Sequence, residues 1–87
     1  MKRSYGDPAY SKWRKTILKR DKRVCKMPSC RSRLKLQVHH IRMWATAHAL
    51  RYEPSNGITL CKKCHMSIRG KESHYEALFM EIVHGLS

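Results

Sequence analysis

The sequence of 87 residues has few large aromatic side chains, with one Phe and two Trp. So little aromatic material leaves a thin core, because a chain of this size buries only a modest share of its surface. Small domains usually need a disulfide, a metal ion or a partner chain in addition. Hydrophobic residues still make up 41% and charged residues 29%, a composition that fits a folded domain rather than a disordered one. We therefore expect a single domain over residues 1–87 that is held together by a cross-link.

Long apolar runs are also missing. No stretch approaches the length of a membrane helix, and the start MKRSYGDPAY lacks the apolar segment of a signal peptide. These absences predict a cytoplasmic protein with no membrane partner.

Acidic residues are scarce: six Asp and Glu stand against 19 Lys and Arg, for a net charge of +13. The excess includes a basic tail over residues 1–6 and predicts nucleic acid as the partner. A solvated basic face that only aids solubility is the alternative.

Two helices are predicted near the ends of the chain. Asp7 and Pro8 suit the cap and first position of a helix that extends to about residue 20. A helix over residues 73–83 follows a capping-box pattern at Ser73 and carries an apolar stripe of Tyr75, Leu78, Phe79 and Ile82. This stripe either packs on the protein's own core or forms the face of a homodimer, and both alternatives stay open.

Short strands are predicted in the middle of the chain, so the fold class is α+β. Apolar residues alternate with polar ones from Leu34 to Val38, which is typical of a half-buried strand. Residues 58–60 predict a second strand, after a loop with the turn residues Pro54, Asn56 and Gly57. Residues 43–50 fit one or two helical turns, and a further helix should end near Gly70.

The four cysteines form two closely spaced pairs, Cys25 with Cys30 and Cys61 with Cys64. Each pair can present two thiolates from a tight turn, and two such turns complete a tetrahedral shell around one zinc ion. Because four thiolates leave no open position, this zinc would be structural and would stabilise the fold directly. Disulfides are a weaker alternative without a signal peptide. A zinc site alone fits a non-catalytic binding module equally well.

The chain resembles the HNH endonuclease family, a branch of the ββα-metal nucleases. The resemblance is carried, in order, by LQVHHI, SNGITLC and CKKCH, with WRKTILKRD and CKMPSC upstream. It covers roughly residues 13–69, with a motif core over 25–69, and is closest in style to short members from phages and prophages. It implies a small zinc-stabilised ββα-metal fold, in which a short antiparallel hairpin is flanked by helices, in a bacterial or phage-infected cell.

The resemblance also implies roles for four residues. His39 and His65 would bind one catalytic divalent cation, and His40 would be the general base that activates water. Asn56 would hold the loop or the His40 ring in place. Two protein ligands suit Mg²⁺ or Mn²⁺, while Ni²⁺, Co²⁺ and Zn²⁺ stay open. Some members carry a third histidine four residues after the last one, where this chain has Arg69.

The sequence therefore predicts a metal-dependent endonuclease that hydrolyses DNA phosphodiester bonds. The alternative is a non-catalytic zinc-finger-type module that binds nucleic acid. In a regular strand His40 would share the apolar face and could be a packing histidine, and Asn56 could be an ordinary turn residue. Six basic residues are predicted to contact DNA: Lys12, Arg14, Lys15, Lys19, Arg42 and Arg69. A phage or host protein partner is undetermined.

Overall fold

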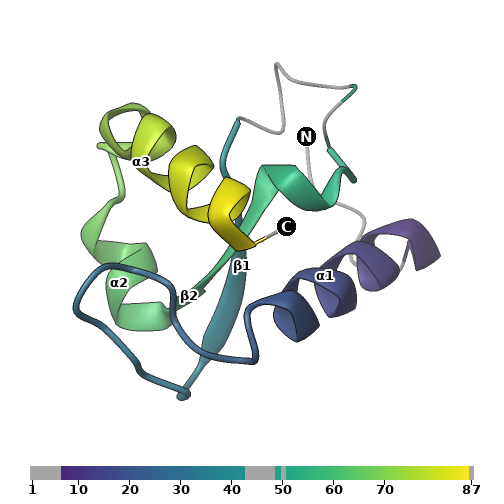
Figure 1. The fold of residues 1–87 in the computed structure, drawn as a ribbon, viewed down its shortest axis with the longest axis horizontal. Helices are drawn as coiled ribbons and strands as arrows, with labels where there is room; N and C mark the ends of the chain where they lie inside the picture. The colour runs from purple at the N-terminus through teal and green to yellow at the C-terminus, as the bar shows by residue number, and fades with distance from the viewer. Residues whose placement is uncertain (1–6, 43–48, 50, 87) are drawn as a thin grey trace.

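A computed structural model describes residues 7–42, 49 and 51–86. Along the chain it contains helix α1 (Pro8–Arg20), strand β1 (Leu36–His40), the 3-10 turn η2 (Pro54–Asn56), strand β2 (Gly57–Cys61), helix α2 (Lys62–Ser67) and helix α3 (Glu72–Leu86). The strands pair antiparallel, with Val38 opposite Thr59 and His40 opposite Gly57. This is the α+β arrangement predicted from the sequence, a short hairpin with flanking helices (Figure 1).

The hairpin is a thin layer with helices on both faces, α1 on one side and α2 and α3 on the other (Figure 1). On the first face Val38 packs against Tyr10, Trp13, Ile17 and Leu18 of α1. On the second face the buried residues are Ile58, Leu60, Ile68, Phe79 and Val83. Because neighbouring strand residues point to opposite faces, His39 and His40 belong to different sides of the hairpin.

The end of α1 is tied to β2 by a buried ion pair. Asp21 is 1% exposed, and its Oδ1 lies 2.8 Å from Nε of Arg20. Its Oδ2 accepts the backbone N–H of Thr59 at 2.9 Å. The Arg20 guanidinium also donates to the carbonyl oxygens of Pro54 at 2.8 Å and Gly57 at 2.7 Å. This network was not predictable from local sequence, because its contacts with η2 and β2 join residues 34 to 38 positions apart in the chain.

Gly57 begins strand β2, which corrects its interpretation as a turn residue. Its φ of −132° is an extended conformation that any residue adopts. A Cβ at this position would instead lie 2.2 Å from Cδ1 of Ile17 and 2.6 Å from Cζ2 of Trp13. Glycine is thus needed here because α1 packs directly against the hairpin backbone.

Two other boundaries differ from the expectation. Leu34 is 76% exposed and precedes β1, because Lys35 adopts a left-handed φ of 49° and interrupts the alternation. Helix α3 begins at Glu72, so Ser73 lies inside the helix and is not its cap. The helical turns expected over residues 43–50 fall almost entirely outside the described residues, as does the tail over 1–6.

The apolar stripe of α3 faces the protein's own core for the most part. Phe79 is fully buried, and Tyr75 and Ile82 pack against the same cluster, whereas Leu78 is 36% exposed. Among the described residues, no helix is long and apolar enough to cross a membrane.

Candidate metal centre and active site

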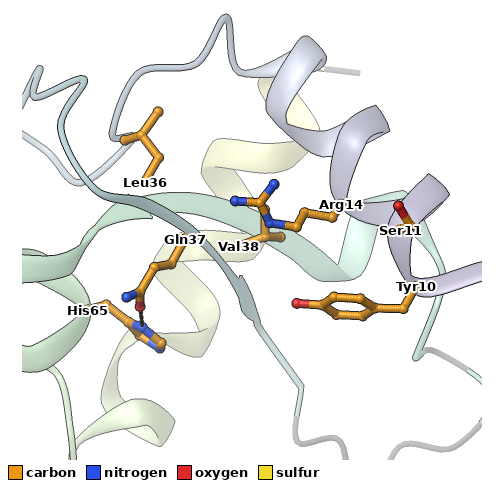
Figure 2. A pocket seen from close by; sticks show the side chains of 7 residues that line it. All are labelled: Tyr10, Ser11, Arg14, Leu36, Gln37, Val38 and His65. Atoms are coloured by element: carbon orange, nitrogen blue, oxygen red, sulfur yellow. Dashed lines mark hydrogen bonds between the residues drawn. The ribbon is translucent and has the colours of Figure 1, made fainter. Parts of the chain in front are cut away.

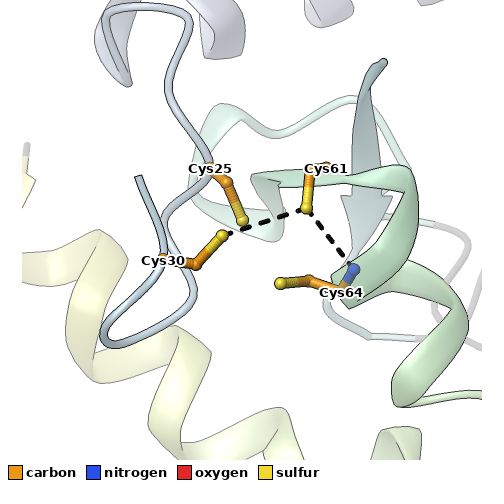
Figure 3. Close-up of side chains that lie close together, drawn as sticks. All are labelled: Cys25, Cys30, Cys61 and Cys64. Carbon is orange, nitrogen blue, oxygen red and sulfur yellow. Dashed lines mark hydrogen bonds between the residues drawn. The ribbon is translucent and has the colours of Figure 1, made fainter. Parts of the chain in front are cut away.

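The four cysteines meet at one point between the loop that joins α1 to β1 and the start of α2 (Figure 3). Their sulfur atoms all lie within 4.8 Å of one another, and Sγ of Cys30 is 3.9 Å from Sγ of Cys61. A tetrahedral zinc ion with Zn–S bonds of about 2.3 Å holds its sulfurs ~3.8 Å apart. The four thiols are therefore positioned to bind a metal ion, and their number and type indicate a structural zinc.

Two turns of the backbone bring the thiols together. The N–H of Cys30 donates to the carbonyl of Met27 at 2.9 Å, and Ser29 adopts a left-handed φ of 68° in this tight loop. At the other pair, the backbone N–H of Cys64 donates to Sγ of Cys61 at 3.4 Å. The loop is also joined to the hairpin, since the N–H of Lys26 donates to the carbonyl of Thr59 at 2.9 Å.

The thiols differ in acidity. The N–H of Cys64 is the main cause that lowers the pKa of the Cys61 thiol to about 7. Burial raises the pKa of Cys25 and of Cys64 above the ordinary value. Because zinc binds thiolates, these two thiols would give up protons when the ion enters.

His39 of β1 and His65 of α2 lie side by side on the α2 face of the hairpin. Their ring centroids are 5.2 Å apart and the rings meet edge to face. A divalent ion ~2.0–2.1 Å from a ring nitrogen lies ~3.2 Å from the ring centre, so two rings that share one ion have their centres no more than ~6.4 Å apart. The pair meets this condition. Phe79 of α3 supports the other side of His39, with centroids 5.8 Å apart.

Gln37 fixes the orientation of His65. Its Oε1 is hydrogen-bonded to Nδ1 of His65 (Figure 2). An amide oxygen only accepts, so Nδ1 carries the proton and donates, and Nε2 carries the lone pair that could bind a metal. The sequence analysis did not single out Gln37, although its place two residues before His39 puts it on the same face of β1.

His40 lies on the opposite face and is 4% exposed. Its ring stacks on Trp13 with centroids 4.1 Å apart and an interplanar angle of 16°. Its Nε2 is 2.9 Å from the carbonyl oxygen of Arg51. A carbonyl accepts only, so Nε2 carries the proton and Nδ1 the lone pair. The indole N–H of Trp13 donates to the carbonyl of Glu53 at 2.7 Å, which fixes the ring beneath His40.

Asn56 is 2% exposed and joins the two ends of the long connection between the strands. Its Oδ1 accepts the N–H of Arg42 at 2.8 Å, and its Nδ2 donates to the carbonyl of Arg42 at 3.4 Å. Its own carbonyl accepts the N–H of Ile41 at 2.9 Å. The side chain therefore holds the backbone directly after His40.

The six predicted DNA contacts fall into separate groups. Lys12, Lys15 and Lys19 are exposed, and at 3.6 residues per turn they share one face of α1. Arg14 is half-buried and lines a groove between α1 and β1. Arg42 pairs with Glu76 at 3.3 Å, and Arg69 is exposed beyond the end of α2. Of these six residues, Arg14 is the one that lines the same groove as His65.

The family comparison agrees with this geometry. The model of the HNH endonuclease family matches residues 24–69, slightly more than half of the chain. The protein belongs to the HNH endonuclease family, which supports a nuclease or another nucleic-acid-related function. Comparison with curated proteins gave no significant match, and neither did comparison with solved structures.

Proposed function

We propose that the protein is a metal-dependent endonuclease that hydrolyses phosphodiester bonds in DNA. The observation that carries the proposal is the pairing of His39 and His65, whose rings lie 5.2 Å apart and within reach of one ion. His65 follows Cys64 directly, so a zinc ion bound by the cysteines would fix the first turn of α2 and hold His65 rigid. The net charge of +13 would draw DNA to this surface.

His39 and His65 would hold the catalytic divalent cation. When bound, that cation supplies charge neutralisation at the phosphate and at the leaving 3′ oxygen. Mg²⁺ and Mn²⁺ suit a site with two protein ligands, since the remaining positions go to water and phosphate. Ni²⁺, Co²⁺ and Zn²⁺ are the other candidates for imidazole ligands.

His40 would take the proton from the attacking water. Its Nε2–H is directed to the Arg51 carbonyl, which leaves Nδ1 as the basic nitrogen. Stacking on Trp13 keeps the ring in one plane. Since the residue is 4% exposed, the surface over His40 has to open for water to reach Nδ1. The products would carry a 5′ phosphate and a 3′ hydroxyl, as the family resemblance implies.

Asn56 would be a positioning residue. It has no need to touch substrate, because its amide holds the backbone of Arg42, two residues beyond His40. Loss of this amide would let the end of β1 shift, and His40 with it. We therefore propose that Asn56 positions the general base, His40.

The test is a nicking assay with supercoiled plasmid and the zinc-loaded protein. Mg²⁺ or Mn²⁺ should convert the plasmid to nicked or linear DNA, and omission of the added ion should stop the reaction. Omission is preferable to a chelator, which would also strip structural zinc. His40→Gln should lower the rate at least a hundredfold, while His74→Gln, at an exposed position of α3, should leave it unchanged. Nicking that survives in His40→Gln would refute the assigned base.

A zinc-stabilised module that binds nucleic acid without cutting it is the second candidate. It is favoured by the burial of His40, whose stacking on Trp13 is also how a packing histidine behaves. The two candidates differ in one outcome of the assay. A module would retard the plasmid on a gel at low salt and leave it supercoiled with every ion.

A further inference from the structure

A groove of about 480 Å³ runs between α1 and the outer edge of β1, beside the proposed metal site. Tyr10, Ser11 and Arg14 line it from α1, and Gln37 and His65 line its other end (Figure 2). We propose that this groove binds a phosphate that flanks the scissile one in the cleaved strand, with Arg14 as its cationic ligand. The inference rests on the proposed function and adds the path of the strand to it.

Arg14 differs from the other half-buried or paired arginines of the fold. Arg20 forms an ion pair with Asp21, and Arg42 forms one with Glu76. Within the described parts of the chain, the guanidinium of Arg14 has no carboxylate or hydrogen-bond partner. A partly desolvated guanidinium is most stable when an anion pairs with it, and its planar donors match phosphate oxygens.

The strand edge adds backbone donors. Thr59 directs its N–H to Asp21 and its carbonyl to Lys26, both away from β1. In an antiparallel pair, opposite residues behave alike, so the N–H of its partner Val38 also points away from the hairpin. That direction is the outer edge of β1, where Val38 lines the groove.

The lining as a whole suits the phosphodiester group of a nucleic-acid strand. It contains a guanidinium, two hydroxyls, a side-chain amide and an imidazole, and none of the described residues that line it is Asp or Glu. Leu36, Gln37 and Val38 line the groove along β1, so a phosphodiester strand bound there would run from the α1 residues toward His65 (Figure 2). The outward lysines of α1 would serve a different purpose, which is attraction of DNA from a distance.

The first test uses a DNA duplex in which the position of cleavage has been mapped. A methylphosphonate replaces one phosphate at a time near that position and removes its charge. In the wild type, neutralisation of one phosphate beside the cut should slow single-turnover cleavage about tenfold. Arg14→Gln should cleave the unmodified duplex about tenfold more slowly than the wild type. Neutralising that same phosphate should then slow the variant by less than a further factor of about two. Lys15→Gln, on the outward face of the same helix, should keep the full tenfold loss. Equal sensitivity of Arg14→Gln and the wild type at every position would overturn the proposal.

The second test does not require cleavage. In the zinc-loaded protein without added Mg²⁺, a short oligothymidylate should shift the NMR signals of the Arg14 Nε–H and the Val38 amide, and Arg14→Gln should abolish the Val38 shift. Inorganic phosphate at the same concentration should have little effect, since the groove recognises a strand. If the wild type fails to cut but shows these shifts, the nuclease proposal is wrong and the groove assignment stands. If the oligonucleotide leaves both signals unmoved, the groove assignment is wrong.

Discussion

Replacing Gly57 by alanine should destabilise the protein by overpacking the contact between α1 and the hairpin. The added Cβ would lie 2.2 Å from Cδ1 of Ile17 and 2.6 Å from Cζ2 of Trp13, where ~3.5–4.0 Å is normal for carbon atoms. Both neighbours are buried, at 0% and 2% exposure, so neither can turn away into solvent. Overpacking of this kind costs about 1–3 kcal/mol, which lowers the Tm of a chain this size by roughly 4–8 °C per kcal/mol.

The other glycines provide matched controls for thermal unfolding of the zinc-loaded variants, followed by circular dichroism. Gly85 lies in α3 with nothing within 4 Å of an added Cβ, so Gly85→Ala should raise the free energy of unfolding by about 0.5–1 kcal/mol. Gly70 has room but a φ of 81°, so Gly70→Ala should cost about 1–2 kcal/mol through backbone strain alone. A Tm of Gly57→Ala at or above the wild-type value, with equal zinc content, would refute the packing argument.

Three further perturbations test the supports of the site. Asp21→Asn should lower the free energy of unfolding by about 3–5 kcal/mol, because it leaves the Arg20 guanidinium without its buried carboxylate. A loss below about 1 kcal/mol in chemical denaturation would contradict this expectation. Gln37→Leu should weaken Mn²⁺ binding about 10–100-fold in calorimetry with an unchanged Tm, and Gln37→Glu should restore it, because the acceptor for Nδ1 of His65 returns. Zinc loading at pH 7 should release protons, and zinc affinity should fall as the pH drops, because burial raises the pKa of the Cys25 and Cys64 thiols, which therefore carry protons at pH 7. Calorimetry in buffers of different ionisation enthalpy measures that release, and a pH-independent affinity would count against the four-thiolate site.

The parts of the fold that depend on local pattern were predictable from the sequence. The cap at Asp7 and the helical spacing of the apolar residues after it predicted the bounds of α1. The spacing of the cysteines predicted that their four thiols form one cluster. Both signals lie within a few residues, where propensity and ligand geometry act directly. The family pattern then named the histidines that the fold brings together, His39 and His65.

The contacts that support the site were not predictable in this way, because they join residues far apart in the chain. The carboxylate of Asp21 bonds to a strand 38 residues later, and the indole of Trp13 donates to a carbonyl 40 residues later. Both residues lie in the WRKTILKRD segment that carries part of the family resemblance, but that segment does not say which distant groups they contact. The same holds for Gly57, whose neighbour Asn56 made it look like a turn residue although tertiary packing is what requires it.

The six basic residues were assigned one shared role from the sequence, as contacts to DNA, and that role stays a prediction. Lys12, Lys15 and Lys19 share an outward face, while Arg14 turns into the groove. Composition counts charges but does not say which of them have partners. Only the packed structure separates Arg14 from an arginine that is already paired, such as Arg20.

The central claim is that His39 and His65 share one hydrolytic cation beside a zinc ion held by the cysteines. A crystal of the zinc-loaded protein soaked in Mn²⁺, with anomalous data collected at the manganese edge, tests it most directly. We expect one manganese peak bonded to a nitrogen of each imidazole, and a separate zinc peak among the four sulfurs. A zinc peak at the cysteines with no manganese between the two histidines would contradict the claim.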